Sequence, residues 1–439
     1  MATMGGRPVA IESEVLVVGG GLAGLTSALA IARAGADVRL LSHKRSTLRN
    51  ASGLVDVLGY TPDGEGPLVD PFAAIPKLPD RHPYRTVGVD AVRDGLALFD
   101  DAVPDYRGAH TDRNALVPTH GGTVKPTARY PGSVAAGLAS DARETLLVGF
   151  EALTDFDAAH AAAHLSAAGV PFEARGVTVR FPGDLRADAA VTRYAALLDE
   201  DSEVTVDGRS VGAREALAKR VTPHVEAAER VGFPAVLGDD DPEGVREGLS
   251  DALGADVFEV PMGPPSLPGL RLAERLFDAL DAAGASIETG NPVVGYEARD
   301  SARSDATRVG HVVVEKNGAK IPYAAEQYVL ATGGLVGKGL ESDREAVREP
   351  VFDCHVSHPE DRYEWFDDDA FGEHAFARFG VETDGDLRPL AADGSPEFDN
   401  LRAAGAVLGG YDFAAEKSGS GVSIATGYAA GRAAAEVVA

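Results

Sequence analysis

The stretch that decides the fold is Ser13–Gly35, which reads SEVLVVGGGLAGLTSALAIARAG. Its apolar residues Val15–Val18 run into three glycines and then into an alanine-rich segment. This order predicts a strand over 13–18, a tight turn and a helix over 22–34. A second strand is expected over 37–42, where the sequence is DVRLLS. The chain therefore opens as a βαβ unit.

Three glycines in the turn, Gly19, Gly21 and Gly24, match the GxGxxG pattern of dinucleotide-binding proteins. The first glycine allows the tight turn, the second lets a pyrophosphate approach the backbone, and the third lets the helix pack closely on the sheet. The amino end of the helix then offers free N–H groups to a phosphate. The pattern follows a predicted strand and opens a predicted helix, so it predicts a bound nucleotide.

The end of the second strand departs from that pattern. A dinucleotide site usually has an acidic residue there to hold the ribose hydroxyls. This chain has Ser42, His43, Lys44 and Arg45 instead. Lys44 and Arg45 could accept a phosphate, which suits NADP or a mononucleotide better than NAD. The sequence therefore does not show whether the bound nucleotide has an adenosine half.

Two segments far along the chain favour a flavin over a nicotinamide. VLATGG at 329–334 is a strand end that opens into glycines, where the backbone could pass close to a cofactor. GSGVS at 419–423 opens the terminal helix, whose amino end favours negative charge on a reduced flavin ring. Together with the amino-terminal turn, they predict an α/β, two-segment Rossmann-like flavoprotein fold with an inserted α/β lobe.

The predicted domains follow from this plan. Residues 10–60 and 262–439 form a discontinuous flavin-binding domain, and residues 61–261 form an inserted α/β lobe that binds substrate or a partner. The segment that follows the second strand is expected to be a loop region up to about residue 144. Further elements are expected as follows: strands over 145–150, 234–238, 256–261, 286–290 and 292–298, helices over 155–169, 187–199, 209–230, 241–253 and 270–284, a hairpin over 311–332 that turns at Asn317–Gly318, and a terminal helix.

Composition narrows the class of protein. The 439 residues carry a net charge of −27, and only eight of the 41 basic residues are lysines. An acidic, lysine-poor surface is typical of proteins that stay in solution at very high salt. No basic stripe is present, which argues against a nucleic-acid partner. The single cysteine, Cys354, excludes an internal disulfide and a cysteine-ligated iron–sulfur cluster within this chain.

No segment predicts a membrane anchor. The apolar run at 14–34 is broken by three glycines and preceded by Glu12 and Glu14. No other run approaches the roughly 20 apolar residues that a spanning helix needs. We expect a soluble, cytoplasmic protein that reaches a membrane only through its partners.

At this point the chain resembles a known family, the B subunits of anaerobic glycerol-3-phosphate dehydrogenase. The resemblance covers nearly the whole length, and the two most specific matches are PPSLPGLRL and the carboxy-terminal pair GVETDGDLRP and AAGAVLGGYD. The matching segments are GGGLAGL (19–25), TLRNASGLVDVL (47–58), HPY (82–84), VGFEALTDFDAAH (148–160), PPSLPGLRL (264–272), VREPV (347–351), GVETDGDLRP (380–389) and AAGAVLGGYD (403–412).

The resemblance implies a flavoprotein within a complex of three different chains. In such a complex the A and B subunits oxidise sn-glycerol 3-phosphate to dihydroxyacetone phosphate, and an iron–sulfur C subunit passes the electrons to the quinone pool. The cofactor implied for the B chain is FMN. A GxGxxG turn normally holds a pyrophosphate, which FMN lacks, so FAD is the alternative cofactor.

Hydride removal from an alcohol carbon needs a base, a flavin within reach and cations for the substrate phosphate. Arg271 and Arg388 are candidates for holding the phosphate or the flavin edge, and His82 and His120 are candidates for the base. Asp56 and Asp412 either bond the cofactor or cap a helix. The residues expected to bind the cofactor are Gly19, Gly21, Gly24, Ser52, Gly53, Gly333, Gly334, Gly405, Ser420, Gly421 and Val422. No metal site is predicted.

Two other functions stay open on the sequence alone. Lys44 and Arg45 motivate an NADP-dependent oxidoreductase. The chain could also be a non-catalytic scaffold that keeps a flavoprotein fold while its A partner carries the substrate site.

Overall fold

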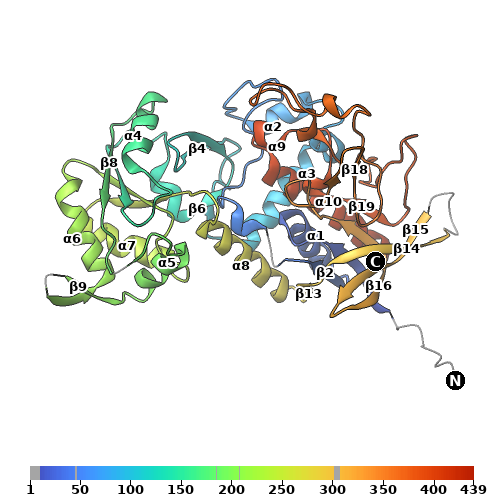
Figure 1. The fold of residues 1–439 in the computed structure, drawn as a ribbon, viewed down its shortest axis with the longest axis horizontal. Helices are drawn as coiled ribbons and strands as arrows, with labels where there is room; N and C mark the ends of the chain where they lie inside the picture. The colour runs from blue at the N-terminus through green and yellow to red at the C-terminus, as the bar shows by residue number, and fades with distance from the viewer. Residues whose placement is uncertain (1–9, 45–46, 184, 207, 301–306) are drawn as a thin grey trace.

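The computed structural model describes residues 10–44, 47–183, 185–206, 208–300 and 307–439, and Figure 1 shows them arranged as two lobes. One lobe contains both ends of the chain. The other lobe is formed by the middle of the chain, drawn in green (Figure 1). The helix α8 (Leu267–Ala282) lies where the two lobes meet.

The first lobe is built on a seven-stranded sheet with the order β13-β2-β1-β16-β15-β14, and β19 pairs with β16. The central pairing joins distant segments, because β1 lies parallel to β16 with Val18 opposite Leu330. The strands are β1 (Ile11–Val18), β2 (Val38–Ser42), β13 (Ser286–Thr289), β14 (Val293–Asp300), β15 (Thr307–Lys316), β16 (Ala319–Leu330) and β19 (Leu401–Ala403).

Two helices from opposite ends of the chain, α1 (Leu22–Arg33) and α10 (Gly419–Val438), pack together without intervening side chains. A Cβ added at Gly427 would lie 2.5 Å from the carbonyl oxygen of Ala23, and one at Gly431 would lie 2.6 Å from that of Ser27. The contacts advance along both helices together, so the helices run in the same direction. Because Gly419 precedes Gly427 by eight residues and Leu22 precedes Ala23 by one, α10 begins about 10 Å beyond the start of α1.

A third helix of this lobe, α3 (Pro83–Ala102), packs on α10, where a Cβ added at Gly95 would lie 3.0 Å from Ile424. The prediction of a loop region up to residue 144 was wrong here. Val92, Leu96 and Phe99 are buried at helical spacing. Gly88, at φ 80°, interrupts the helix, so the run of apolar residues at helical spacing in the sequence is short. The short helices α2 (Pro71–Ala74) and α9 (Phe413–Glu416) lie in the same lobe.

The second lobe has a parallel four-stranded sheet with the order β12-β11-β7-β8. Its strands are β7 (Thr145–Phe150), β8 (Ala174–Val179), β11 (Arg230–Pro234) and β12 (Asp256–Val260), and its helices are α4 (Ala158–Ala167), α5 (Val191–Asp199), α6 (Ala213–Val225) and α7 (Pro242–Leu253). Short strand pairs complete the described fold: β3 (Tyr106–Arg107) with β6 (Tyr130–Pro131), β4 (Ala115–Pro118) with β5 (Val124–Thr127), β9 (Glu203–Val206) with β10 (Arg209–Gly212), and β17 (Glu341–Ser342) with β18 (Val347–Arg348).

Most predicted elements are confirmed within a few residues, and two are wrong. The helix expected over 209–230 begins only at Ala213, after the strand β10, and ends at Val225. The strand expected over 234–238 lies earlier, over Arg230–Pro234. A charged residue opens that strand and hid its buried character from the hydrophobic pattern.

The predicted division at residues 60 and 262 stays a prediction, and packing adds detail to it. Phe72, Tyr84 and Phe99 lie in the same hydrophobic core as α1 and α10, although they fall inside the expected insertion. The helix α8 contributes to both cores, with Leu267 in the second and Leu272 in the first. Across the described residues, no helix is both long enough and apolar enough to cross a bilayer.

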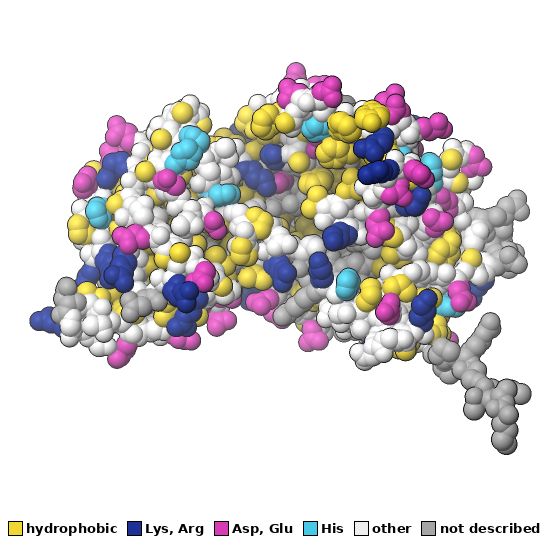
Figure 2. Space-filling view, in the orientation of Figure 1, with side chains coloured by type: hydrophobic (Ala, Val, Ile, Leu, Met, Phe, Trp, Pro, Cys, Tyr) yellow, Lys and Arg dark blue, Asp and Glu magenta, His cyan; other side chains and the backbone are white. Residues whose placement is uncertain are grey.

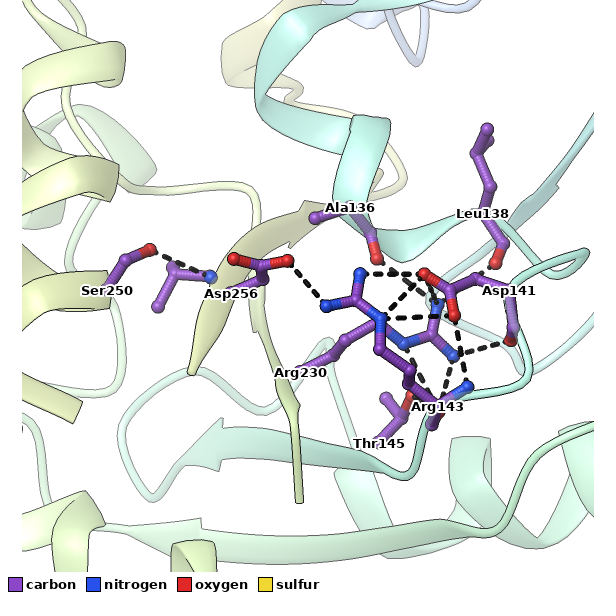
Figure 3. Close-up of polar contacts among 9 residues, drawn as sticks. Ala136, Leu138, Asp141, Arg143, Thr145, Arg230, Ser250 and Asp256 are labelled. Atoms are coloured by element: carbon purple, nitrogen blue, oxygen red, sulfur yellow. Dashed lines mark hydrogen bonds and ion pairs between the residues drawn. The ribbon is translucent and has the colours of Figure 1, made fainter. Parts of the chain in front are cut away.

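The charged residue that opens β11 is Arg230, whose side chain is 1% exposed. Its guanidinium donates five hydrogen bonds of 2.8–3.2 Å to backbone carbonyls of the loop at 136–143 (Figure 3). Beside it, Arg143 bonds both Asp141 and Asp256 at 2.7 Å. Arg143 lowers the pKa of Asp141 to about 2. This cluster fixes the loop that leads into β7.

Replacing Arg230 with lysine tests that role. Lysine carries three donors where arginine carries five, so at least two of the bonds are lost and carbonyls are left unsatisfied. We expect Arg230→Lys to lower the free energy of unfolding by about 3 kcal/mol in denaturant titrations. Arg193→Lys, at an exposed position of α5, is the matched control and should change little. Equal stability of the two variants would contradict the assignment.

Candidate functional site

The amino end of α1 has free hydrogen-bond donors. Gly21 is the N-cap and supplies no side chain, and the first turn contains no acidic residue. Within the described part of the chain, no acceptor takes the N–H groups of Leu22, Ala23 or Gly24. Free N–H groups and the helix dipole make this end suited to a phosphate.

The amino end of α10 is open in the same way. The N–H of Gly421 donates to the carbonyl of Asp56 at 2.7 Å, whereas those of Gly419 and Ser420 have no acceptor among the described residues. The first turn of α10 also lacks acidic residues. Because the two helices run in the same direction and touch, both open ends lie at the same end of the pair. One open end suits a phosphate, and the other suits a group that gains negative charge.

The three glycines of the amino-terminal turn do different work. A Cβ at Gly19 would lie 2.1 Å from the carbonyl oxygen of Ala331, and one at Gly24 would lie 1.9 Å from that of Gly19. These two glycines are required by the protein's own packing. At Gly21, by contrast, the nearest atom to an added Cβ is the Thr47 hydroxyl at 3.7 Å, and φ is −79°. The fold leaves space at Gly21, as a cradle for a bound group would.

The structure brings the other predicted glycines to the same place. A Cβ at Gly405 would lie 2.5 Å from the Cβ of Ala23, at the start of α1. A Cβ at Gly334 would lie 2.6 Å from the carbonyl of Ala406, the residue that follows Gly405. Gly333 has φ 90°, and only Gly337 lies within 4 Å of its Cβ position. The ends of β16 and β19 therefore meet beside α1.

The predicted residues after β2 reach the start of α10. The hydroxyl of Ser420 donates to the carbonyl of Leu54 at 3.3 Å, and a Cβ at Gly421 would lie 2.6 Å from the carbonyl of Asp56. Ser52 and Gly53 directly precede this segment. Gly53 has φ 78° and packs on Pro268 of α8, and Val422 is fully buried. All eleven predicted cofactor residues thus lie around the two helix ends, while their contacts with a cofactor stay a prediction.

A charged cluster borders the start of α10. The ammonium of Lys125, from β5, lies 2.8 Å from the carboxylate of Asp56, and their side chains are 22% and 7% exposed. Thr127 donates to the same carboxylate at 3.4 Å. Burial raises the pKa of Asp56, and the charges of Lys125 and Lys417 oppose that rise. A buried carboxylate with a raised pKa is the kind of group that transfers protons.

His82 lies close to this cluster but is sealed from solvent. Its Nδ1 accepts the backbone N–H of Tyr84 at 3.1 Å, so the proton must sit on Nε2, which donates to Glu416 at 3.0 Å. Both side chains are at most 1% exposed. Glu416 also accepts from the hydroxyl of Ser418, the N-cap of α10. We therefore see His82 as a residue that fixes the start of α10, out of a substrate's reach.

The remaining predicted catalytic residues lie elsewhere. Arg271 on α8 forms an ion pair with the buried Glu259, with oxygens 2.7 and 3.1 Å from its two terminal nitrogens. Arg388 is paired with Asp384 at 2.7 Å in a surface turn. His120 lies in the turn of the β4–β5 hairpin, half-buried, near Gly263. Asp412 caps α9 by accepting from Ala414 and Ala415.

Sequence reasoning missed Lys125 and Lys417. The sequence did offer a signal, because the chain has only eight lysines and a net charge of −27, so each lysine that it keeps is a candidate for a specific role. Figure 2 shows Lys and Arg side chains on both sides of the hollow between the lobes, although the chain is strongly acidic. Within the described ranges, no cluster of three or more His, Cys, Asp or Glu residues is placed to hold a metal ion.

Comparisons with known proteins agree with this geometry. The family described as FAD binding domain matches residues 14–422. The chain is 71% identical over 430 residues to the probable anaerobic glycerol-3-phosphate dehydrogenase B subunit of Halobacterium salinarum, covering 98% of this chain and 99% of that protein. It is 30% identical over 441 residues to the anaerobic glycerol-3-phosphate dehydrogenase B subunit of Vibrio cholerae, covering 94% of each. The acidic composition fits a relative from Halobacterium.

A solved structure shows only a distant likeness. The 3-ketosteroid-Δ4-(5α)-dehydrogenase of Rhodococcus jostii superposes with a TM-score of 0.39 at 13% identity, over 100% of this chain and 98% of that one.

Substitution at Gly21 separates binding from folding. A valine there meets open space in the protein but fills the approach to the free N–H groups, so we expect Gly21→Val to fold with an unchanged melting temperature and to lose its cofactor at least tenfold. Gly24→Ala should instead destabilise the chain, because its Cβ would meet backbone. Gly385→Val, in an open loop position, is the control. The measurement is the cofactor content of each purified variant by absorbance. If Gly21→Val kept all of its cofactor, the turn at Gly21 would not be a ligand site.

Proposed function

The chain belongs to the family of anaerobic glycerol-3-phosphate dehydrogenase B subunits and is built on a flavin-binding oxidoreductase domain, and from this we propose that it takes part in the oxidation of sn-glycerol 3-phosphate to dihydroxyacetone phosphate. The observation that carries the proposal is the side-by-side arrangement of two open helix ends, α1 and α10, in a chain 71% identical to such a protein. The first would face a cofactor phosphate, and the second would face the ring.

We propose FAD as the cofactor in place of the FMN that the sequence analysis favoured. The matched family is described by FAD binding, and the open position at Gly21 suits a pyrophosphate, which FMN lacks. The missing acid after β2 argued for FMN. Ser42 and Lys44 are linked to each other by a hydrogen bond from the Ser42 hydroxyl to the Lys44 carbonyl, and Arg45 lies outside the described residues.

The residues around the two helix ends would hold the flavin. Gly21 and the N–H groups of Leu22 to Gly24 would take the phosphates, and Gly405 and Gly334 would line the passage between the helices. The N–H groups of Gly419 and Ser420 would face the ring edge that becomes negative on reduction. When bound, the flavin supplies a two-electron acceptor for the hydride that leaves the alcohol carbon.

We propose Asp56 as the group that accepts the hydroxyl proton of the substrate. Its backbone carbonyl accepts the N–H of Gly421 in the first turn of α10, which holds the residue at that helix end, and burial raises the pKa of its carboxylate. Lys125 at 2.8 Å fixes the orientation of the carboxylate, and Thr127 donates to its other oxygen. Asp56 would take the proton of the hydroxyl group, and the carbon that bears this group would lose a hydride. The ketone product remains, so protons and electrons balance.

The family also motivates partner chains. The relatives are named as one component of an enzyme, so we propose that this chain assembles with the catalytic A subunit, and with an iron–sulfur C subunit that passes electrons to quinone. The single cysteine requires that any cysteine-bound cluster lie in a partner. Membrane association would then come from the partners.

The two alternatives are less well supported. The hypothesis of an NADP-dependent oxidoreductase was based on Lys44 and Arg45, and neither the family nor the geometry favours it. A non-catalytic scaffold would have no use for an open cradle at Gly21, so flavin content and substrate response separate it from the proposed enzyme.

Heat release of the cofactor from the purified chain tests the assignment. We expect chromatography of the supernatant to give FAD at close to one equivalent. Adding sn-glycerol 3-phosphate to the anaerobic complex should bleach the flavin absorbance, and glycerol without phosphate should not. FMN would overturn the choice of cofactor, NADP would restore the alternative, and a colourless chain that cannot be reconstituted would refute the flavoprotein.

Substitution of Asp56 tests the proton acceptor. Because its pKa is raised, the carboxylate becomes protonated and inactive as the pH falls, so the rate of flavin bleaching should decline toward acid pH. We expect Asp56→Asn to slow bleaching at least a hundredfold, to remove the acid limb of the pH profile and to keep flavin content and substrate affinity. Lys125→Met should shift that limb toward higher pH, because the cation that lowers the pKa of Asp56 is gone. Lys219→Met, at a surface ion pair, is the control. An unchanged acid limb in Asp56→Asn would exclude this residue.

A further inference from the structure

One segment of the first lobe carries several exposed aromatic side chains. Among the described residues, ten large hydrophobic side chains are exposed, and five of them lie between residues 336 and 376. Val336 is 88% exposed and Phe371 is fully exposed. The other three are Tyr363, Phe366 and Phe376. Exposed hydrophobic residues are ordinary when they are scattered singly over a surface. Several of them close together in the chain are typical of an interaction site.

Two of these five side chains, Phe366 and Phe376, line a groove of about 720 Å³, whose walls also include Leu335, Leu340 and Trp365. Its shape is fixed by the fold. The indole of Trp365 donates to the carbonyl of Pro359 at 2.7 Å and packs edge-on against Phe379 and His358, with ring centroids 5.9 and 5.5 Å apart. The groove is therefore preformed, which reduces the entropy lost on docking.

The segment 359–373 supplies Trp365 and Phe366 to the groove wall and so borders it, and this border is strongly acidic, whereas the charged residues of the wall itself are Lys338 and Glu341. Between residues 359 and 373 the chain carries seven carboxylates and one arginine, Arg362. Several carboxylates also shape the turns that hold the aromatics outward: Asp361 accepts the N–H of Tyr363, and Asp369 accepts that of Phe371. We name the aromatic and acidic residues of 336–376 together the aromatic–acidic face. Its segment includes the strands β17 and β18 and belongs to the first lobe (Figure 1).

We propose that the aromatic–acidic face is the docking surface for a separate protein chain, whose own face presents apolar side chains inside a ring of lysine and arginine. The charge decides between occupants. A second copy of this chain would bring two acidic borders together, and an anionic membrane would meet the same repulsion. A basic ring on a protein partner would complement the border, and the apolar centre would supply the affinity where salt screens the charges.

The place of the face in the fold gives it a role that rests on the proposed function. The groove begins at Leu335, one residue after Gly334, and continues through Lys338 and Leu340. Gly333 and Gly334 line the proposed flavin site. A partner docked in the groove would therefore stand next to the loop that borders the flavin, which suits a protein that receives electrons.

Removal of the two most exposed apolar side chains tests the surface without risk to the fold. We expect Val336→Ser/Phe371→Ser to bind the companion chains of the proposed complex at least tenfold more weakly by light scattering after size exclusion. Flavin content and melting temperature should stay at wild-type values, because both side chains lie in solvent. Val69→Ser/Val437→Ser, at positions 62% and 54% exposed, is the matched control and should bind normally.

Two further measurements locate the contact and its charge. Trp365 is the only tryptophan of the chain, so the single fluorine resonance of fluorotryptophan-labelled protein should shift when the companions bind. Glu364→Gln/Asp368→Asn should slow association, and that effect should fade as salt rises over the range in which the chain stays folded.

Each outcome bears on the proposal. Normal assembly of Val336→Ser/Phe371→Ser, or an unshifted fluorine resonance in the complex, would overturn the surface. A homodimer of the wild-type chain that the double variant abolishes would overturn the choice of occupant. A wild-type chain that binds flavin and responds to substrate but never binds companions would overturn the partner and leave the proposed oxidation intact.

Discussion

The rest of the site depends on the contact between α1 and α10. Gly427 and Gly431 let the backbone of α10 rest on Ala23 and Ser27, and larger residues there would separate the helices. Because the helices run in the same direction, this contact alone sets where their free N–H groups lie relative to one another. The same contact joins the two ends of a 439-residue chain, so the site can form only when distant segments have met.

Lysine, arginine and carboxylate side chains occupy different kinds of position in this chain. The chain has a net charge of −27, yet two of its eight lysines, Lys125 and Lys417, act on one buried carboxylate, Asp56. At the opposite extreme, the aromatic–acidic face concentrates carboxylates around exposed rings. Arginine takes the structural positions instead: Arg230 donates five hydrogen bonds to four carbonyls, and Arg271 neutralises the buried Glu259. A planar guanidinium with several donors suits such roles better than an ammonium.

The sequence predicted the elements whose evidence is local, and it failed where partners come from afar. The turn at Gly19–Gly24 and the end of β16 carry their own signatures, so the fold class could be predicted, and so could the meeting of these glycine segments beside α1. The helix α3 was missed because Gly88 divides its pattern. Arg271 and Arg388 were singled out by position alone, but no pattern reveals that Glu259 and Asp384 already occupy them. Lys125 was missed because its significance depends on Asp56, which lies 69 residues away in the sequence.

The helix α8 belongs to both lobes, and this has a mechanical consequence. Leu267 at its start packs in the core of the second lobe, Leu272 and Leu276 pack in the first, and Arg271 between them clasps Glu259 of β12. A rigid strut of this kind resists hinge bending. The orientation of the two lobes relative to each other is therefore set when the chain folds, and a change in it would have to break the ion pair between Arg271 and Glu259 or unpack one end of α8.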